Sequence, residues 1–166
     1  MKKYLFGLAI TFSSLLLDLV TKSLVVNNIN PSNPIDFFGG FLRITLVYNR
    51  GGVFGILQGY KNMFLIVSIV VLVIMIIFYI LEKNKPYLFV FSMSLIMGGA
   101  LGNIWDRLVP GRVGVVDFIS IGVDKFYRWP AFNVADSVIV IGAFFLALLF
   151  IKEEKKKSSN KGNLNE

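Results

Sequence analysis

Two aspartates with apolar neighbours are the residues of this chain best suited to chemistry. Asp117 follows two valines in VVDFIS, and Asp136 heads residues 136–151, which hold no other charged side chain. Burial among apolar groups disfavours the charged form of a carboxyl, and two carboxyls that meet push their pKa values apart. One can then take a proton from water while the other, protonated, donates a hydrogen bond to a carbonyl. The pair therefore predicts acid–base hydrolysis.

The sequence contains no cysteine and no histidine. This composition excludes a thiol nucleophile, a Ser-His triad, a His/Cys zinc site and a disulfide. Hydrolysis would therefore use carboxylates or a Ser/Lys pair, and we expect neither a metal nor an organic cofactor.

Three more charged residues lie in or at the end of apolar runs. Because a charge near the bilayer centre costs about 2.5 to 3.5 kcal/mol, each needs a reason. Asp18 and Lys22 stand four apart with the acid first, the favourable order for an ion pair. We interpret them as a structural, mutually neutralising pair that fixes the first helix, with substrate positioning as the alternative.

The third, Asp106, belongs to GNIWDR, residues 102–107, where Asn103, Asp106 and Arg107 can share one helical face. One interpretation is an interfacial anchor made of Trp105 and an Asp106–Arg107 charge pair. The other is a polar site, in which Asp106 beside a cation suits a scaffold better than a proton donor.

Four apolar runs approach the length that a bilayer demands. They cover residues 4–26, 63–81, 87–105 and 134–151 of a 166-residue chain that is 55% hydrophobic. No small-residue cleavage site follows the first run, so we interpret it as a retained anchor. The sequence therefore predicts an all-α integral membrane protein, a bundle of four transmembrane helices with a small extracytoplasmic β-hairpin or sheet region.

The lysines next to these runs predict the orientation. By the positive-inside rule, one side of the membrane is cytoplasmic and carries Lys2, Lys3, Lys83, Lys85, Lys152, Lys155, Lys156, Lys157 and Lys161. Both termini would be cytoplasmic, and residues 27–62 and 106–133 would form outer loops. Because the third span exits and the fourth enters, Asp106, Asp117 and Asp136 would converge at the outer leaflet.

Asp136 also has a structural explanation. Asn133 stands three residues before it, as in a capping box, and an acid in a first helical turn interacts favourably with the helix dipole. Taken alone, capping is the stronger explanation, and the convergence of three acids favours a shared site.

We expect one membrane domain over residues 1–151 and a disordered basic cytoplasmic tail over residues 152–166. The net charge of +7 does not indicate nucleic acid, because the basic residues are concentrated beside the spans.

Two patterns predict packing. Strand-prone runs around Gly39 and Gly40, in IDFFGGFLRITLVYN, indicate a hairpin with one apolar face that lies on the membrane or lines a substrate groove. Gly98-x-x-x-Gly102 in the third run and Ala143-x-x-x-Ala147 in the fourth indicate that these two helices touch.

Five blocks of the chain, in order, resemble bacterial lipoprotein signal peptidase (signal peptidase II), an intramembrane aspartyl protease. They are DLVTK (18–22), YNRGGVFG (48–55), GGALGNIWDR (98–107), VVDF (115–118) and WPAFNVADS (129–137). Two departures stand out. NRGGVF at residues 49–54 replaces the family's usual Asn-x-Gly-Ala-Ala-Phe, and Asp117 follows Asp106 by eleven residues where nine are usual. The extra pair predicts a wider turn around Gly111 and Gly114.

The resemblance implies a catalytic dyad of Asp117 and Asp136. It also implies that the site is shaped and polarised by Asn49, Asn103, Asp106, Arg107 and Asn133. The substrates would be prolipoproteins with a diacylglyceryl group on the lipobox cysteine, cleaved just before that cysteine in the bacterial cytoplasmic (inner) membrane. Membrane lipids and globomycin-like peptide inhibitors would be further partners.

The alternative function is a small proton-coupled membrane transporter whose carboxylates carry protons. It explains the acids equally well, but not their convergence on one leaflet. Acids on a transport path would more often lie at mid-depth in several spans, and the second and fourth runs have none there.

Overall fold

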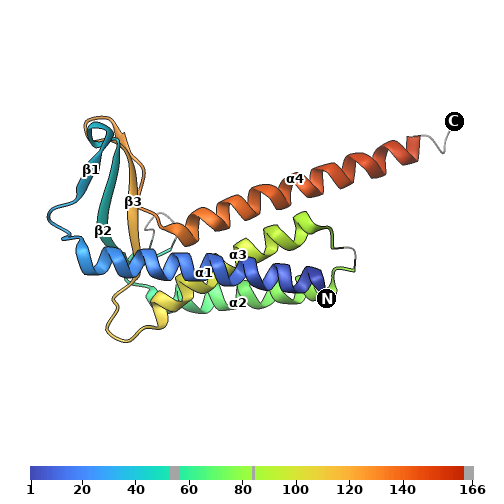
Figure 1. Ribbon diagram of the computed structural model, residues 1–166, viewed down its shortest axis with the longest axis horizontal. Coiled ribbons are helices and arrows are strands. Elements are labelled where there is room, and N and C mark those ends of the chain that lie inside the picture. The colour runs from blue at the N-terminus through green and yellow to red at the C-terminus, as the bar shows by residue number, and fades with distance from the viewer. Residues whose placement is uncertain (53–56, 84, 163–166) are drawn as a thin grey trace.

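Four long helices make up most of the protein. The computed structural model describes residues 1–52, 57–83 and 85–162, with side chains through Lys157. The helices are α1 (Lys2–Asn28), α2 (Lys61–Leu81), α3 (Tyr87–Leu108) and α4 (Val134–Gly162). All four are long and apolar enough to cross a membrane, so the four predicted spans are confirmed as helices. Both termini lie at the same end of the bundle (Figure 1).

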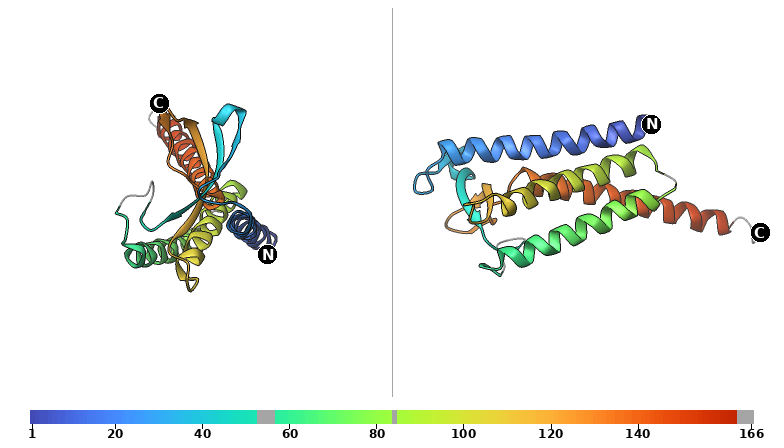
Figure 2. Two further views of the ribbon diagram at one scale, coloured as in Figure 1. Left: turned by 90° about the vertical axis from the view of Figure 1, so that its left-hand side faces the viewer. Right: turned by 90° about the horizontal axis from the view of Figure 1, so that it is seen from below.

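α3 is the central helix of the bundle. It contacts α1, α2 and α4. In its most apolar 18-residue stretch, 56% of the residues are buried, against 17% or less in the corresponding stretches of the other three helices. The views along and from below the bundle show α1 and α2 packed beside it, while α4 leaves the bundle toward its C-terminal end (Figure 2). Because α3 packs against all three other helices, it is the helix best able to hold side chains in place.

Glycines set the contacts between α3 and its neighbours. A Cβ at Gly98 would lie 2.8 Å from Thr11 O and from Ser14 Cβ, both on α1. Gly99 and Gly142 are the residues that let α3 and α4 approach. The predicted α3–α4 contact is therefore present, but Gly98 and Gly102 face α1 instead. Two further residues of the predicted pattern, Ala143 and Ala147, are exposed.

A four-stranded antiparallel sheet lies at the end of the bundle away from the termini (Figure 1). Its strands, in spatial order, are β1 (Ile35–Phe37), β2 (Leu42–Asn49), β3 (Val115–Val123) and β4 (Tyr127–Arg128). The predicted hairpin is present, with a 3-10 turn at Phe38–Gly40. The all-α class is too narrow, because β3 from the second loop extends the hairpin into a sheet.

The sheet is attached to the bundle through its apolar face. Leu46 of β2 and Val116 and Phe118 of β3 form one buried cluster with Val25 of α1. Side chains alternate along a strand, so Asp117, between Val116 and Phe118, points to the opposite face. This attachment fixes the position of Asp117 relative to the helices.

Ion pairs join the distal part of the sheet. Arg43 of β2 binds Asp36 of β1 at 2.6 Å and Asp124 of the β3–β4 turn at 2.9 Å, and Arg128 binds Asp124 at 2.7 Å. Hydrogen bonds from Arg43 hold the pKa of Asp36 below its usual value. One face of the distal sheet is therefore charged.

The C-terminal segment differs from its prediction. α4 continues through Gly162, so residues 152–162 are helical where we expected disorder, and residues 163–166 lie outside the described part. A helix already nucleated by its apolar span extends at little cost, and Glu153 stands four residues before Lys157, which favours a helix.

Candidate active site

Asp117 is a buried carboxyl held by two asparagines. Its side chain is 3% exposed. Asn49 Nδ2, at the end of β2, donates to Oδ2 at 3.1 Å, and Asn133 Nδ2 donates to Oδ1 at 2.7 Å. Burial, followed by the nearby carboxylate of Asp136, raises the pKa of Asp117 to about 7. Asp117 can therefore exchange a proton near neutral pH.

Asp136 lies in the first turn of α4 and belongs to a reciprocal capping box. Its backbone N–H donates to Asn133 Oδ1 at 2.8 Å, while the Asn133 N–H donates to Asp136 Oδ2 at 3.3 Å. The other oxygen, Oδ1, accepts a hydrogen bond from Asn103 Nδ2 of α3 at 2.8 Å. Capping thus occupies one carboxylate oxygen and leaves the other to face α3.

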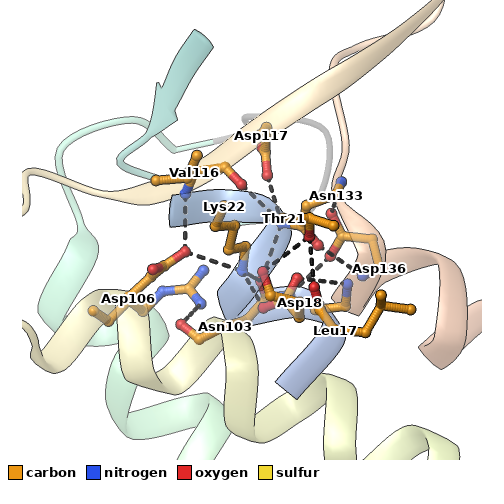
Figure 3. A network of polar contacts seen from close by, with 12 residues as sticks. Leu17, Asp18, Thr21, Lys22, Asn103, Asp106, Val116, Asp117, Asn133 and Asp136 are labelled. Carbon is orange, nitrogen blue, oxygen red and sulfur yellow. Dashed lines mark hydrogen bonds and ion pairs between the residues drawn. The ribbon is translucent and has the colours of Figure 1, made fainter. Parts of the chain in front are cut away.

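Asn133 connects the two acids directly (Figure 3). It is fully buried. Its side-chain Nδ2 donates to Asp117, its backbone N–H donates to the Asp136 carboxylate, and its side-chain Oδ1 accepts the Asp136 N–H. The same Nδ2 lies within hydrogen-bond distance of Asn103 Oδ1, at 3.2 Å. The structure therefore brings Asp117 and Asp136, 19 residues apart in the sequence, to the same asparagine.

Asn49 also organises the backbone beside Asp117. Its Nδ2 donates to Gly52 O at 3.1 Å, and its Oδ1 accepts from the Gly51 N–H at 3.0 Å and from Gln58 Nε2 at 3.2 Å. Val53, Phe54 and Gly55, which belong to the second block of the resemblance, lie outside the described residues.

Arg107 does not form the charge pair that the sequence suggested. Its guanidinium donates to Asn103 O at 3.0 Å and to Gly51 O at 3.1 Å. Asp106 pairs instead with Lys22 Nζ at 3.0 Å and with Arg112, and its Oδ2 accepts the Val116 N–H at 3.0 Å. The carboxylate of Asp106 is fully buried and is held by these three donors.

Arg112 is a site-forming residue that the sequence did not single out. It follows a turn in which Gly111 has a φ of +78°, and its backbone N–H donates to Val109 O at 3.2 Å. A turn is therefore present at Gly111, and after it Arg112 pairs with Asp106. At Gly114 the chain passes close to the backbone of Asn49. The spacing signalled a longer turn but could not signal where its cation would point.

The predicted Asp18–Lys22 ion pair is confirmed, with a 2.7 Å contact, and both side chains are 0% exposed. It does more than neutralise itself. Asp18 Oδ1 accepts the Ala135 N–H of α4 at 2.9 Å, and Lys22 Nζ donates to Asn103 Oδ1 of α3 at 3.1 Å. The pair joins α1 to both helices of the site.

Comparison with known proteins gives this arrangement a family. Residues 10–152 match the family model described as signal peptidase (SPase) II. This chain belongs to the signal peptidase II family. It is 37% identical over 158 residues to the lipoprotein signal peptidase of Staphylococcus haemolyticus, covering 94% of this chain and 98% of the relative. It is 42% identical over 144 residues to that of Caldicellulosiruptor bescii, covering 87% and 89%.

The fold also resembles solved structures. A bacterial membrane enzyme determined by the in meso method superposes with a TM-score of 0.80 at 32% identity, covering 92% of this chain and 91% of the other. A second structure of a bacterial membrane enzyme superposes with a TM-score of 0.75 at the same identity, covering 89% and 93%. Signal peptidase II is a peptidase, so this protein is a hydrolase, and its four spanning-length helices agree with a multi-pass membrane protein.

All seven site residues that the resemblance implied lie in one connected set of contacts. They are Asn49, Asn103, Asp106, Arg107, Asp117, Asn133 and Asp136. They come from α3, α4, the ends of β2 and β3, and the segment before α4, so only the folded chain assembles them.

Proposed function

We propose that this signal peptidase II family member is an intramembrane aspartyl endopeptidase. It removes the signal peptide from diacylglyceryl-modified prolipoproteins by cleaving just before the lipidated cysteine. The observation that supports this proposal is the pair of carboxyls, Asp117 and Asp136, bound to the same asparagine, with the pKa of Asp117 raised to about 7. A buried acid that can hold a proton near neutral pH, close to a second carboxyl, suits direct attack by water.

The reaction needs no covalent intermediate. The ionised acid of the pair takes a proton from a water molecule, whose oxygen forms a bond to the scissile carbonyl carbon. The protonated acid donates its proton to the carbonyl oxygen as the tetrahedral intermediate forms. The acid that took the proton from water gives it to the amide nitrogen as the C–N bond breaks. The other acid takes back a proton from a hydroxyl of the intermediate as the new carboxyl C=O forms, so the acid and amine products leave and the pair is restored. Such acid–base assistance contributes about 10² to 10⁴ in rate.

The surrounding side chains would hold the acids and the substrate. Asn49 and Asn133 each donate to Asp117 and so fix the plane of its carboxyl. Arg107 holds the Gly51 carbonyl against α3. We propose that Arg107, together with the asparagines, orients the substrate backbone and the lipid head group. Positioning of this kind, in a site from which water is largely excluded, would supply much of the remaining acceleration.

We place the site near the extracytoplasmic leaflet of the bacterial inner membrane, with both termini cytoplasmic. The positive-inside rule supports this orientation, since lysines gather at the end of the bundle that carries the termini. The sheet would then be extracytoplasmic. Its exposed apolar residues, including Ile35, Phe37 and Val123, suit contact with lipid or with a lipidated substrate. Globomycin-like peptides would compete for the same site.

A proton-coupled transporter is the weaker candidate. In the described part of α2 there is no acidic side chain, and the acid in the apolar part of α4 is Asp136, in its first turn. Protons would therefore lack carboxylates along much of a path across the bilayer.

The deciding experiment is an assay of the reconstituted protein with a diacylglyceryl-modified substrate, in which release of the signal peptide is followed. Asp117→Asn and Asp136→Asn should each lower turnover by at least about 10²-fold. Asp124→Asn, which changes an exposed acid of the sheet, is the matched control and should keep turnover. Parent-level turnover in both dyad variants would refute the protease. If Asp18→Asn alone abolished a proton-coupled flux, the transporter would be supported.

A further inference from the structure

The ammonium of Lys22 is enclosed by polar partners inside the protein. An ammonium carries three N–H donors and no acceptor. Lys22 Nζ lies 2.7 Å from Asp18 Oδ2, 3.0 Å from Asp106 Oδ2 and 3.1 Å from Asn103 Oδ1, and the side chain is fully buried (Figure 3). Because Lys22 is fully buried among these neighbours, any effect that it has on the reaction passes through them.

Asn103 connects Lys22 to Asp136. A carboxamide can be turned two ways, with its oxygen and its NH₂ exchanged. Lys22 can only donate, so Asn103 must present Oδ1 to it, and the NH₂ then faces Asp136 Oδ1 at 2.8 Å. The reverse orientation would set an NH₂ against an ammonium and a carbonyl oxygen against a carboxylate. The charge of Lys22 thus selects the donor that Asp136 meets.

Asp106 connects Lys22 to the strand that carries Asp117. Asp106 Oδ2 forms an ion pair with Lys22 and accepts a hydrogen bond from the backbone N–H of Val116, the residue directly before Asp117 on β3. Arg112 binds the other oxygen of Asp106. Asp106 therefore ties the strand of Asp117 to α3, in a position that depends on Lys22.

We propose that Lys22 is a positioning residue common to both acids, acting on Asp136 through Asn103 and on Asp117 through Asp106. The proposal rests on the proposed function, since it assumes that these two acids perform the reaction. Stability alone is a weak reason for a fully buried ion pair, because replacing such a pair with apolar groups of similar size is often neutral or favourable. Positioning supplies the reason that stability does not.

The test is the double substitution Asp18→Asn with Lys22→Met, which removes the two charges together. The asparagine can still accept the Ala135 N–H, and Asp106 keeps Arg112 and the Val116 N–H, so no buried carboxylate is left without a partner. In the signal-peptide release assay, kcat should fall roughly 10²-fold, as expected for misplaced reacting groups, while KM stays near the parent value.

The matched control is Phe89→Ala. Phe89 is 2% exposed and belongs to the buried cluster with Met93 and Leu149, toward the other end of α3. It should lower the melting temperature at least as much as the double substitution does, while leaving kcat unchanged. This comparison separates loss of geometry from loss of stability.

Two kinetic results would overturn the proposal: an unchanged kcat in the double variant, or a loss of kcat that follows the melting temperature equally in the double variant and in Phe89→Ala. The second variant is Lys22→Gln. Its carboxamide can present either an NH₂ or an oxygen to Asn103 and so no longer fixes the orientation of Asn103, and this variant should also lose kcat. If neither Lys22 variant folds, Lys22 is a folding residue and the proposal fails. Failure of the proposed function is recognised separately, by full turnover in Asp117→Asn and Asp136→Asn.

Discussion

At the scale of single residues, Asn133 both caps α4 and contacts the proposed dyad. Its backbone and Oδ1 complete the capping box with Asp136, while its Nδ2 binds Asp117. The capping contacts of Asp136 are therefore compatible with its proposed catalytic role. The cap fixes the carboxyl at the start of α4, and the fixed carboxyl can then influence Asp117.

The raised pKa of Asp117 predicts how stability depends on pH. The folded protein keeps a proton on Asp117 up to about pH 7, whereas the unfolded chain releases it near 3.8. The folded state therefore binds more protons between these values, and stability should fall as pH rises through them, by at most about 1.4 kcal/mol per pH unit. Melting temperatures followed by tryptophan fluorescence should show this slope in the parent and a flatter one in Asp117→Asn. Equal slopes would contradict the prediction.

At the scale of elements, the site depends on how closely α3 and α4 approach. Gly99 of α3 packs against the backbone of Ala135, the residue before Asp136. Asn103, one turn further along α3, then reaches Asp136. The spacing that Gly99 permits between the two helices thus determines whether this hydrogen bond of the site can form.

Gly99→Val should separate the two helices. Its Cβ would collide with the Ala135 carbonyl and with Ile139, so we expect a loss of about 1 to 3 kcal/mol in stability, as for overpacking, together with reduced turnover. Ala143→Val makes the same kind of change at an exposed position of α4 and should alter neither quantity. Thermal unfolding and the signal-peptide release assay measure the two effects. Parent-like turnover in Gly99→Val would show that the site tolerates a wider helix spacing.

At the scale of the whole molecule, the two ends of the bundle differ in chemistry. One end carries the sheet and the acids, and the other carries both termini (Figure 1). Between them, the helices expose apolar side chains such as Ile66 and Ile74 of α2, as lipid-facing surfaces do. Because its two ends differ in this way, the molecule can take one preferred orientation in a membrane.

The orientation can be measured with single cysteines, because the chain has none of its own. Phe126→Cys lies in the β3–β4 turn, where Phe126 is 89% exposed, and Lys83→Cys lies between α2 and α3. A membrane-impermeant maleimide should label Phe126→Cys in intact spheroplasts and Lys83→Cys only after permeabilisation. The opposite pattern would reverse the proposed topology.

The sequence by itself determined the four helices, the hairpin and the Asp18–Lys22 pair, and it predicted seven residues of the candidate site. It could do so because hydropathy, strand alternation and helical spacing are local properties, and because five blocks matched a known family. Only the tertiary structure decided which cation meets Asp106, which glycines face which helix, and that β3 joins the hairpin in one sheet. Those outcomes depend on where distant segments pack, since Lys22 and Arg112 reach Asp106 from a different helix and from a turn whose direction no local pattern specifies.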